Sequence, residues 1–335
     1  MFQGEGQDPA EKTVGEHQNT YLITVFVCAF LSVLFSNIGL LSMFYLVPLG
    51  YAILACNSLK FPFFITALAN VFFYLVFKQK NNASLMWMEI FHLTVVLLCF
   101  SWIMNGGEFP QIRTAYRFII SCCVGAVALL VSFFVLSSTA EFQLILEETL
   151  QAVSSAISPS VEDDIAMNPF LQKMLTVQGM LELTKNILLR GGALASVFFL
   201  FYINRLLSLA SFWIVKKQKR DNGLAAFFAP ANTIWVFSGA IATILLSRTF
   251  DVVFLEIMAW NVFVVCAILF LAQGAGILRF LLARRTPGMR IFVNILIIFV
   301  LFISPLNAVA VAALLLLGIV ENWLPFRQPK QRSFV

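Results

Sequence analysis

Apolar residues in this chain form long unbroken runs, and the polar residues gather between those runs. A helical run of about 20 apolar residues is long enough to cross the ~30 Å hydrocarbon core of a bilayer. A membrane β-barrel would instead show alternation in segments of about ten residues, so the pattern predicts helices. The predicted runs are residues 20–37, 38–56, 61–77, 84–104, 118–138, 187–220, 231–248, 252–284 and 290–320.

Two of these runs contain helix-breaking residues. Pro48 and Gly50 lie within 38–56, which follows the first run with almost no loop, so we expect a kinked or broken helix there. The run 290–320 has Pro305 near its middle and is either one kinked span or two half-helices. The fold class predicted is all-α, a polytopic transmembrane bundle of about 8–10 spans or half-spans.

Residues 139–186 differ from the rest because they are rich in Asp and Glu and poor in Lys and Arg. Apolar residues recur at helical spacing on both sides of Ser158-Pro159, which predicts an elbow of two amphipathic helices outside the membrane. Helices that lie on a membrane are usually basic, so we expect the elbow to pack over the ends of the bundle. The predicted parts are a polar tail (1–19), an N-terminal membrane half (20–138), the elbow (139–186), a C-terminal membrane half (187–326) and a basic tail (327–335).

The composition agrees with a membrane protein. Of the 335 residues, 60% are hydrophobic and 12% are charged, against about 25% charged in soluble domains. The net charge of +5 sits at helix ends, where anionic lipid headgroups account for it, so nucleic acid is not an expected partner. The six cysteines lie in or beside apolar runs without metal-ligand spacing, and we expect neither a metal nor another cofactor.

Basic clusters orient the spans. The cluster at 216–220 closes the run 187–220 and marks its cytoplasmic end. Counting crossings from it places the elbow outside and the N-terminus in the cytoplasm. Lys78 and Lys80 then fall on the side away from the cytoplasm. The enrichment of Lys and Arg on the cytoplasmic side is a statistical bias and allows such an exception. A basic C-terminal tail on the cytoplasmic side would require a return near Pro305.

Polar residues inside the predicted spans are the candidate functional residues, because polar groups are costly in lipid. Asn204 and Arg205 lie deep in the run 187–220, and an arginine at that depth needs a partner or a water-filled cavity. Glu89 and His92 lie three residues apart on one helix face and would suit a proton relay or a solute contact. The alternatives are an interfacial position for Glu89 and an interhelical hydrogen bond for His92.

Small residues predict close helix packing at two places. Cys28, Ser32 and Ser36 recur every four residues on one face, where packing within the chain is favoured over docking of another subunit. Gln273 lies beside Gly274, which suits a close helix contact more than a bend around a ligand. The sequence contains no phosphate-binding glycine loop, metal-ligand cluster or serine-nucleophile motif, so we do not expect an enzyme.

The C-terminal half contains a series of short motifs: YIN at 202–204, FAP at 228–230, FLAQG at 270–274, LLARR at 281–285 and LGIVENWLPFR at 317–327. Together they resemble the YybS-like family, bacterial multispanning membrane proteins with a domain of unknown function. Gly274, Glu321 and Arg327 belong to these motifs and have no assigned chemistry. The chain departs from the family at Glu321, where an Asp is common, and at Gly191-Gly192, where a Pro commonly begins the span.

The resemblance implies a location and a role. The family is distantly similar to the substrate-binding S components of energy-coupling-factor transporters, which implies a bacterial inner (cytoplasmic) membrane and a small solute. It also implies a transporter coupling subunit that docks at a small-residue face such as Cys28, Ser32 and Ser36. The alternative is a non-catalytic structural or assembly protein of the cell envelope, whose elbow contacts an envelope protein. The solute site would draw on Asn204, Arg205, Gln273, Glu89 and His92.

Overall fold

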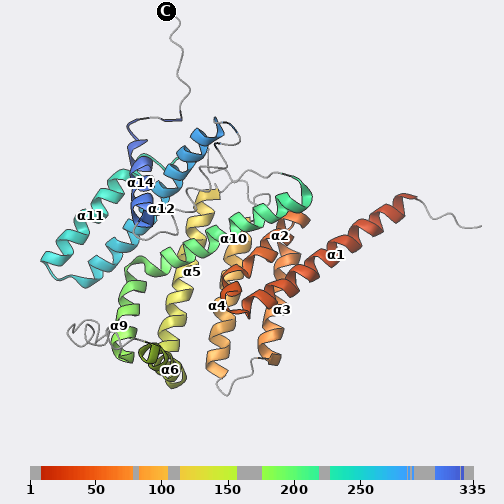
Figure 1. Ribbon diagram of the computed structural model, residues 1–335, viewed down its shortest axis with the longest axis horizontal. Helices are drawn as coiled ribbons and strands as arrows, with labels where there is room; N and C mark the ends of the chain where they lie inside the picture. Colours follow the sequence, from red (N-terminus) through yellow and green to blue (C-terminus); the bar gives the residue numbers. More distant parts are fainter. Residues whose placement is uncertain are drawn as a thin grey trace, which may run out of the picture. The chain divides into compact units, whose positions relative to one another are not determined.

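The computed structural model describes residues 9–77, 83–104, 114–156, 176–218, 227–284, 286, 289, 306–324 and 326–327. The regular structure in these residues is helical, as predicted. In chain order the helices are α1 (Pro9–Ser36), η1 (Gly39–Phe44), α2 (Leu46–Cys56), α3 (Lys60–Phe77), α4 (Ala83–Met104), α5 (Thr114–Ser137), α6 (Ala140–Ala156), α9 (Val177–Ile187), η2 (Leu188–Gly192), α10 (Ala193–Lys216), α11 (Thr233–Thr249), α12 (Val253–Ala283) and α14 (Leu306–Val320) (Figure 1).

Five helical stretches in the described residues are long and apolar enough to cross a bilayer, so the chain is a helical membrane bundle. These stretches are Lys60–Phe77, Met86–Met104, Tyr116–Ser137, Val177–Lys216 and Val253–Leu282. Shorter apolar helices are Thr20–Ser36, Leu41–Cys56, Thr233–Thr249 and Ala308–Val320.

Helix α3 shows most directly that lipid is the solvent. Its buried face includes the polar side chains of Thr66 and Asn70. Its outward face carries Phe64, Leu68 and Phe72, which are 65%, 67% and 62% exposed. In water, exposing these apolar side chains while burying polar ones would be unfavourable. The arrangement is stable in a bilayer, where acyl chains cover the outward face of α3.

Helix α1 begins earlier than the first apolar run. The sequence analysis assigned residues 1–19 to a polar tail, whereas the helix already includes Pro9. A helix that is established in the apolar run extends at little cost into the preceding polar residues, because each added residue makes one hydrogen bond. Residues 1–8 lie outside the described part.

The expected break in 38–56 is present, as the 3₁₀ helix η1 followed by α2. A second break separates α9 from α10, where the backbone of η2 kinks at Arg190 and Gly191. Gly191 has φ +94°, a conformation that glycine adopts readily and that other residues avoid. The helix is therefore interrupted at this glycine.

Two described helices fall within or at the edge of residues 139–186, α6 and α9; they contact each other, and α6 also contacts α5. The Thr176 side chain caps α9 by accepting a hydrogen bond of 3.1 Å from the Gly179 N–H. Residues 157–175 lie outside the described part. Since α9 runs through η2 into α10, the elbow and the next span form one interrupted helix (Figure 1).

The chain divides into two units, Met1–Lys219 and Arg220–Val335. The division follows α10, whereas the sequence analysis began its C-terminal half at residue 187. Helix α10 ends where Lys217 adopts a left-handed conformation with φ +55°. Whether 290–320 forms one span or two half-helices depends on residues 290–305, which lie outside the described part.

In unit 1, α10 is the central element and packs against α2 and α5, and α4 packs against α5 (Figure 1). The side chains of Phe100 and Phe201 are fully buried in the core, with ring centroids 6.0 Å apart. Ser208 of α10 faces Gly50 of α2 so closely that a Cβ on Gly50 would overlap the hydroxyl. This glycine allows α2 and α10 to approach.

In unit 2, α12 packs against both α11 and α14 (Figure 1). Phe237 stacks on Phe263 with ring centroids 5.0 Å apart and meets Phe270 edge-on at 5.6 Å. Phe270 is fully buried, so these rings form the centre of the unit.

Candidate functional site

A cavity of about 360 Å³ lies within unit 1, between η1, α4, α5 and α10. His92 and Asn204 lie in its wall, and each stands near the middle of its helix. Sites of this size, mostly apolar with a few polar groups, are typical of small-molecule binding. The lining residues are Met43, Phe44, His92, Val96, Leu129, Ser196, Val197, Phe199, Leu200, Ile203 and Asn204.

Asn204 is fully buried, and its amide nitrogen is already used. The Nδ2 group donates to the backbone carbonyls of Met43 and Leu200, both at 2.8 Å. The Oδ1 atom is buried and has no hydrogen-bond partner. Because the two donated bonds fix the amide orientation, the unused atom is an acceptor.

His92, on α4, has the same character. Its ring hydrogen-bonds to the backbone of Ala128 on α5, whereas Nδ1 is buried without a partner. The bond to a carbonyl places the proton on Nε2, and neutral Nδ1 is then an acceptor. A buried polar atom without a partner costs about 1–3 kcal/mol, so His92 Nδ1 and Asn204 Oδ1 both lower the stability of unit 1.

The cavity opens at the surface of unit 1. Its rim is formed by three exposed lining residues, Met43 (46% exposed), Phe199 (54% exposed) and Ser196. Val96 and Val197 are buried at its inner wall. Among the described lining residues none carries a formal charge.

Two predicted site residues lie elsewhere in unit 1. Glu89 is on α4, partly exposed, and no hydrogen bond joins it to His92 in the described residues. Arg205 follows Asn204 in sequence but is not part of the cavity wall. It interacts electrostatically with Tyr202 and with Arg117 of α5. Neighbouring residues on a helix point about 100° apart, so Asn204 and Arg205 face different surroundings.

The small-residue face of α1 is covered by the chain itself. Cys28 and Ser32 are buried. The Ser32 hydroxyl donates to the Tyr45 carbonyl at 2.8 Å, and Ser36 donates to the Val33 carbonyl at 2.8 Å. This face therefore packs inside unit 1 rather than standing open to another subunit.

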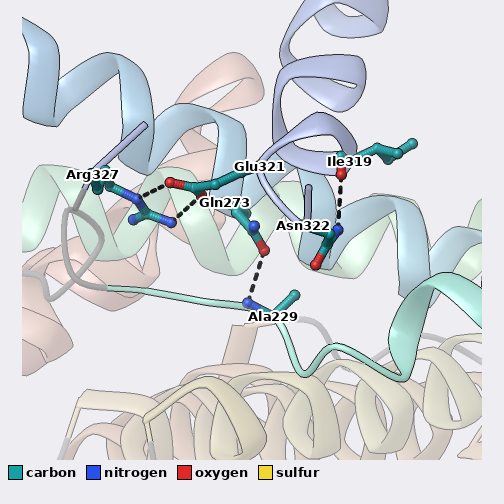
Figure 2. A network of polar contacts seen from close by, with 6 residues as sticks. All are labelled: Ala229, Gln273, Ile319, Glu321, Asn322 and Arg327. Atoms are coloured by element: carbon teal, nitrogen blue, oxygen red, sulfur yellow. Dashed lines mark hydrogen bonds and ion pairs between the residues drawn. The ribbon is translucent and has the colours of Figure 1, made fainter. Parts of the chain in front are cut away.

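Gln273 belongs to unit 2, where its amide oxygen accepts a hydrogen bond of 2.9 Å from the Ala229 N–H (Figure 2). Gln273 is 2% exposed, and the bond ties the segment before α11 to α12. This position does not belong to the cavity of unit 1. Its observed role is a hydrogen bond that holds two parts of unit 2 together.

Glu321 and Arg327 form a buried ion pair beyond the end of α14 (Figure 2). Arg327 donates from Nε to Oε1 at 2.7 Å and from Nη2 to Oε2 at 2.5 Å, a bidentate arrangement. The guanidinium carbon also lies 3.9 Å from the centroid of the Phe228 ring. The pair therefore fixes residues 228 and 327 around the end of α14.

Gly274 and Gly318 mark the crossing of α12 and α14. A Cβ on Gly274 would overlap the Leu314 carbonyl oxygen, and a Cβ on Gly318 would overlap the Phe270 carbonyl oxygen. The two backbones touch because both side chains are absent. The motif segments 228–230, 270–274 and 317–327, far apart in sequence, thus meet in unit 2.

Sequence reasoning selected Asn204 and His92 but missed the rim residues Met43 and Ser196. Ser196 is a single hydroxyl in an apolar run, and Met43 looks like any other apolar residue, so neither gave a usable signal. The described residues contain no group of three His, Cys, Asp or Glu side chains able to hold a metal ion. Comparison with protein-family models, curated proteins and solved structures gives no match.

Proposed function

We propose that this protein is a small-solute-binding or transport component of a bacterial inner membrane, with its site in the cavity of unit 1. One observation carries the proposal: His92 and Asn204 lie in the wall of the same cavity, and each has a buried acceptor without a partner. Native proteins pair nearly all buried polar atoms, and each unpaired one calls for an explanation, such as a functional role or a bound group. The cavity near the helix centres is also where membrane transporters hold their solutes.

The proposal includes partners and orientation. The chain contains no ATP-binding motif, so energy for transport would come from a coupling subunit or an ion gradient. The bundle is placed with the basic end of α10 and the N-terminus in the cytoplasm. Because Cys28, Ser32 and Ser36 are covered, a coupling subunit would use another surface.

Kinship with the YybS-like family is part of the same proposal. Three of the motif segments that carry the resemblance meet in unit 2, around Gln273, Gly274, Glu321 and Arg327. Residues that are distant in sequence and meet in space are what a shared fold would retain.

The second candidate function is a structural or assembly protein of the cell envelope. The polar contacts of unit 2 favour it. The motif polar groups of this unit bond to one another instead of facing a cavity. Deleting residues 141–182 from a chain with this function would detach an envelope partner. An unchanged set of co-purifying proteins after that deletion would count against it.

The proposed function is tested by purifying the protein from native membranes in mild detergent and identifying bound small molecules by mass spectrometry. The variant Ser196→Phe fills the cavity rim without touching a buried hydrogen bond. Ala195→Phe is the matched control, since Ala195 is also exposed on α10 but does not line the cavity.

We expect a molecule that wild type and Ala195→Phe retain and Ser196→Phe loses. A co-purifying ATPase with a membrane coupling subunit would support the transport role. No retained molecule, or equal retention by both variants, would overturn the proposal.

A further inference from the structure

We infer that Ser32 and Ser208, neither of which lines the unit 1 cavity, position its wall by holding the broken backbone between η1 and α2. The inference rests on the proposed function and adds two positioning residues to its site. Asn204, which is itself part of the wall, is the third residue that holds this backbone.

One part of the cavity wall comes from the 3₁₀ helix η1, whereas the other described lining residues belong to α-helices. Met43 and Phe44, the last two residues of η1, line the cavity, and Met43 also lies at its rim. A single residue, Tyr45, separates η1 from α2. The position of this part of the wall therefore depends on what fixes the backbone at the break.

The backbone at the break is held by side chains from two neighbouring helices. From α1, Ser32 donates a hydrogen bond of 2.8 Å to the Tyr45 carbonyl. From α10, Asn204 donates one of 2.8 Å to the Met43 carbonyl. Breaks in membrane helices are tolerated where neighbouring helices and their polar side chains bond to the backbone groups that the break frees. The two bonds therefore hold the end of η1 and the residue that joins it to α2.

Ser208 of α10 adds a weaker bond at the start of α2. Its hydroxyl oxygen lies 3.1 Å from the Val47 carbonyl oxygen and 2.7 Å from the Asn204 carbonyl oxygen, so its single proton is shared between them. The two helices are close here, because a Cβ on Gly50 would overlap the Ser208 hydroxyl. Ser208 therefore holds α2 by direct packing as well as by hydrogen bonding.

Ser32 and Ser208 allow positioning to be tested separately from contact with a solute. Both are fully buried and neither lines the cavity, so replacing them removes no group of its wall, whereas a change at Asn204 would. Their loss would let Met43 and Phe44 shift. A gap of about 0.5–1 Å forfeits roughly a quarter to a half of each van der Waals contact with a bound molecule.

The experiment uses the full chain, purified from native membranes in mild detergent, as wild type, Ser32→Ala, Ser208→Ala and Ser247→Ala. Ser247 is the matched control, since it is a buried serine of unit 2 whose hydroxyl bonds to the Ile244 carbonyl of its own helix. Hydrogen–deuterium exchange measures the opening of residues 39–47 and needs no ligand. Mass spectrometry measures the retained small molecule, and thermal unfolding measures global stability.

We expect Ser32→Ala to speed amide exchange in residues 39–47 about tenfold, which corresponds to one lost hydrogen bond of about 1.4 kcal/mol. Ser208→Ala should give a smaller increase, because its proton is shared. Both variants should lose the retained molecule, Ser32→Ala more than Ser208→Ala, while exchange in α4 and α5 stays as in wild type. Ser247→Ala should keep wild-type exchange in residues 39–47 and keep the molecule, whatever its thermal stability.

The outcomes separate the two proposals. Unchanged exchange in residues 39–47 in both variants would overturn the inference, and so would faster exchange throughout unit 1, which indicates general loss of stability. Faster local exchange with full retention of the wild-type molecule would also overturn it, because the break would then not shape the site. A wild-type protein that retains no molecule would overturn the proposed function, and the inference with it.

Discussion

Buried polar groups are used differently in the two units of this protein. In unit 1, Asn204 and His92 line a cavity, and each keeps an acceptor atom without a partner. In unit 2, Gln273, Glu321 and Arg327 are bonded within the unit. Both sets appear in the sequence as polar residues within or beside apolar runs, so the sequence alone does not distinguish them. The difference teaches that a polar residue in a membrane helix points to folding when its bonding is complete, and is a candidate for function where incomplete bonding coincides with a cavity.

The largest effect is expected at the ion pair. Arg327→Ala leaves the Glu321 carboxylate buried without its cation, which should lower the free energy of unfolding by about 3–5 kcal/mol. Thermal unfolding in detergent, followed by size-exclusion chromatography, measures the loss. Arg284→Ala is the control, because the exposed Arg284 stacks on Phe280 at 4.3 Å and should cost less than about 1 kcal/mol. Equal losses in the two variants would show that the pair does not stabilise unit 2.

The helix crossing comes next. Gly274→Ala places a Cβ against the Leu314 carbonyl and should cost about 1–3 kcal/mol through overpacking. Gly239→Ala on α11 meets nothing within 4 Å and should instead stabilise by about 0.5–1 kcal/mol, because alanine loses less backbone entropy. The sign of the difference in thermal stability is the test. A neutral Gly274→Ala would mean that α12 and α14 can separate freely.

A loss of the same order is expected at Gln273. Gln273→Leu leaves the Ala229 N–H without an acceptor, at a cost of about 1–3 kcal/mol, with no change in the small molecule that the purified protein retains. Asn322→Ala is the control. The Asn322 amide bonds to the Ile319 carbonyl, which also accepts from the Asn322 backbone N–H, so that carbonyl keeps a partner. Loss of the retained molecule in the Gln273 variant would place Gln273 in the binding site.

The smallest effect is expected at the cavity. His92→Phe removes one hydrogen bond to Ala128 and one unpaired acceptor together, so the free energy of unfolding should change by less than about 1 kcal/mol. The same thermal unfolding experiment measures it beside Gln273→Leu. A loss as large as that of Gln273→Leu would mean that His92 serves the fold as Gln273 does, and the contrast between the units would fail.

Much of the fold could be predicted because lipid imposes one strong rule, that backbone groups bond within helices. The apolar runs located the spans. A break was expected within 38–56 and is present at Tyr45, just before Pro48 in the first turn of α2, whereas Gly50 lies inside that helix. The start of α1 at Pro9 was missed because helix extension into polar residues leaves no apolar pattern. The sequence analysis singled out Gly191-Gly192 but predicted no kink there, because the kink depends on backbone angles that the sequence does not give.

The site was predicted in part. Asn204 and His92 stood out as polar residues in apolar runs, and the structure brings them to one cavity. Arg205 stood out equally and lies outside the cavity wall, because which face of α10 turns inward depends on tertiary packing. Gln273 was assigned to the solute site, yet it bonds within unit 2. The polarity of a position can be predicted from sequence, but its partner cannot.

The Gly274 and Gly318 contact has a consequence for assembly. Among helices in lipid, an apolar side chain gains little by choosing a neighbour over an acyl chain, so most of the α12 surface does not define a register. Gly274 and Gly318 do define a register, because sliding α14 by one residue would press a side chain into the facing backbone. Helix α12 is synthesised before α14, and the gap at Gly274 stays open until α14 packs against it. The two glycines, which have no side chain, therefore define where α14 docks on α12.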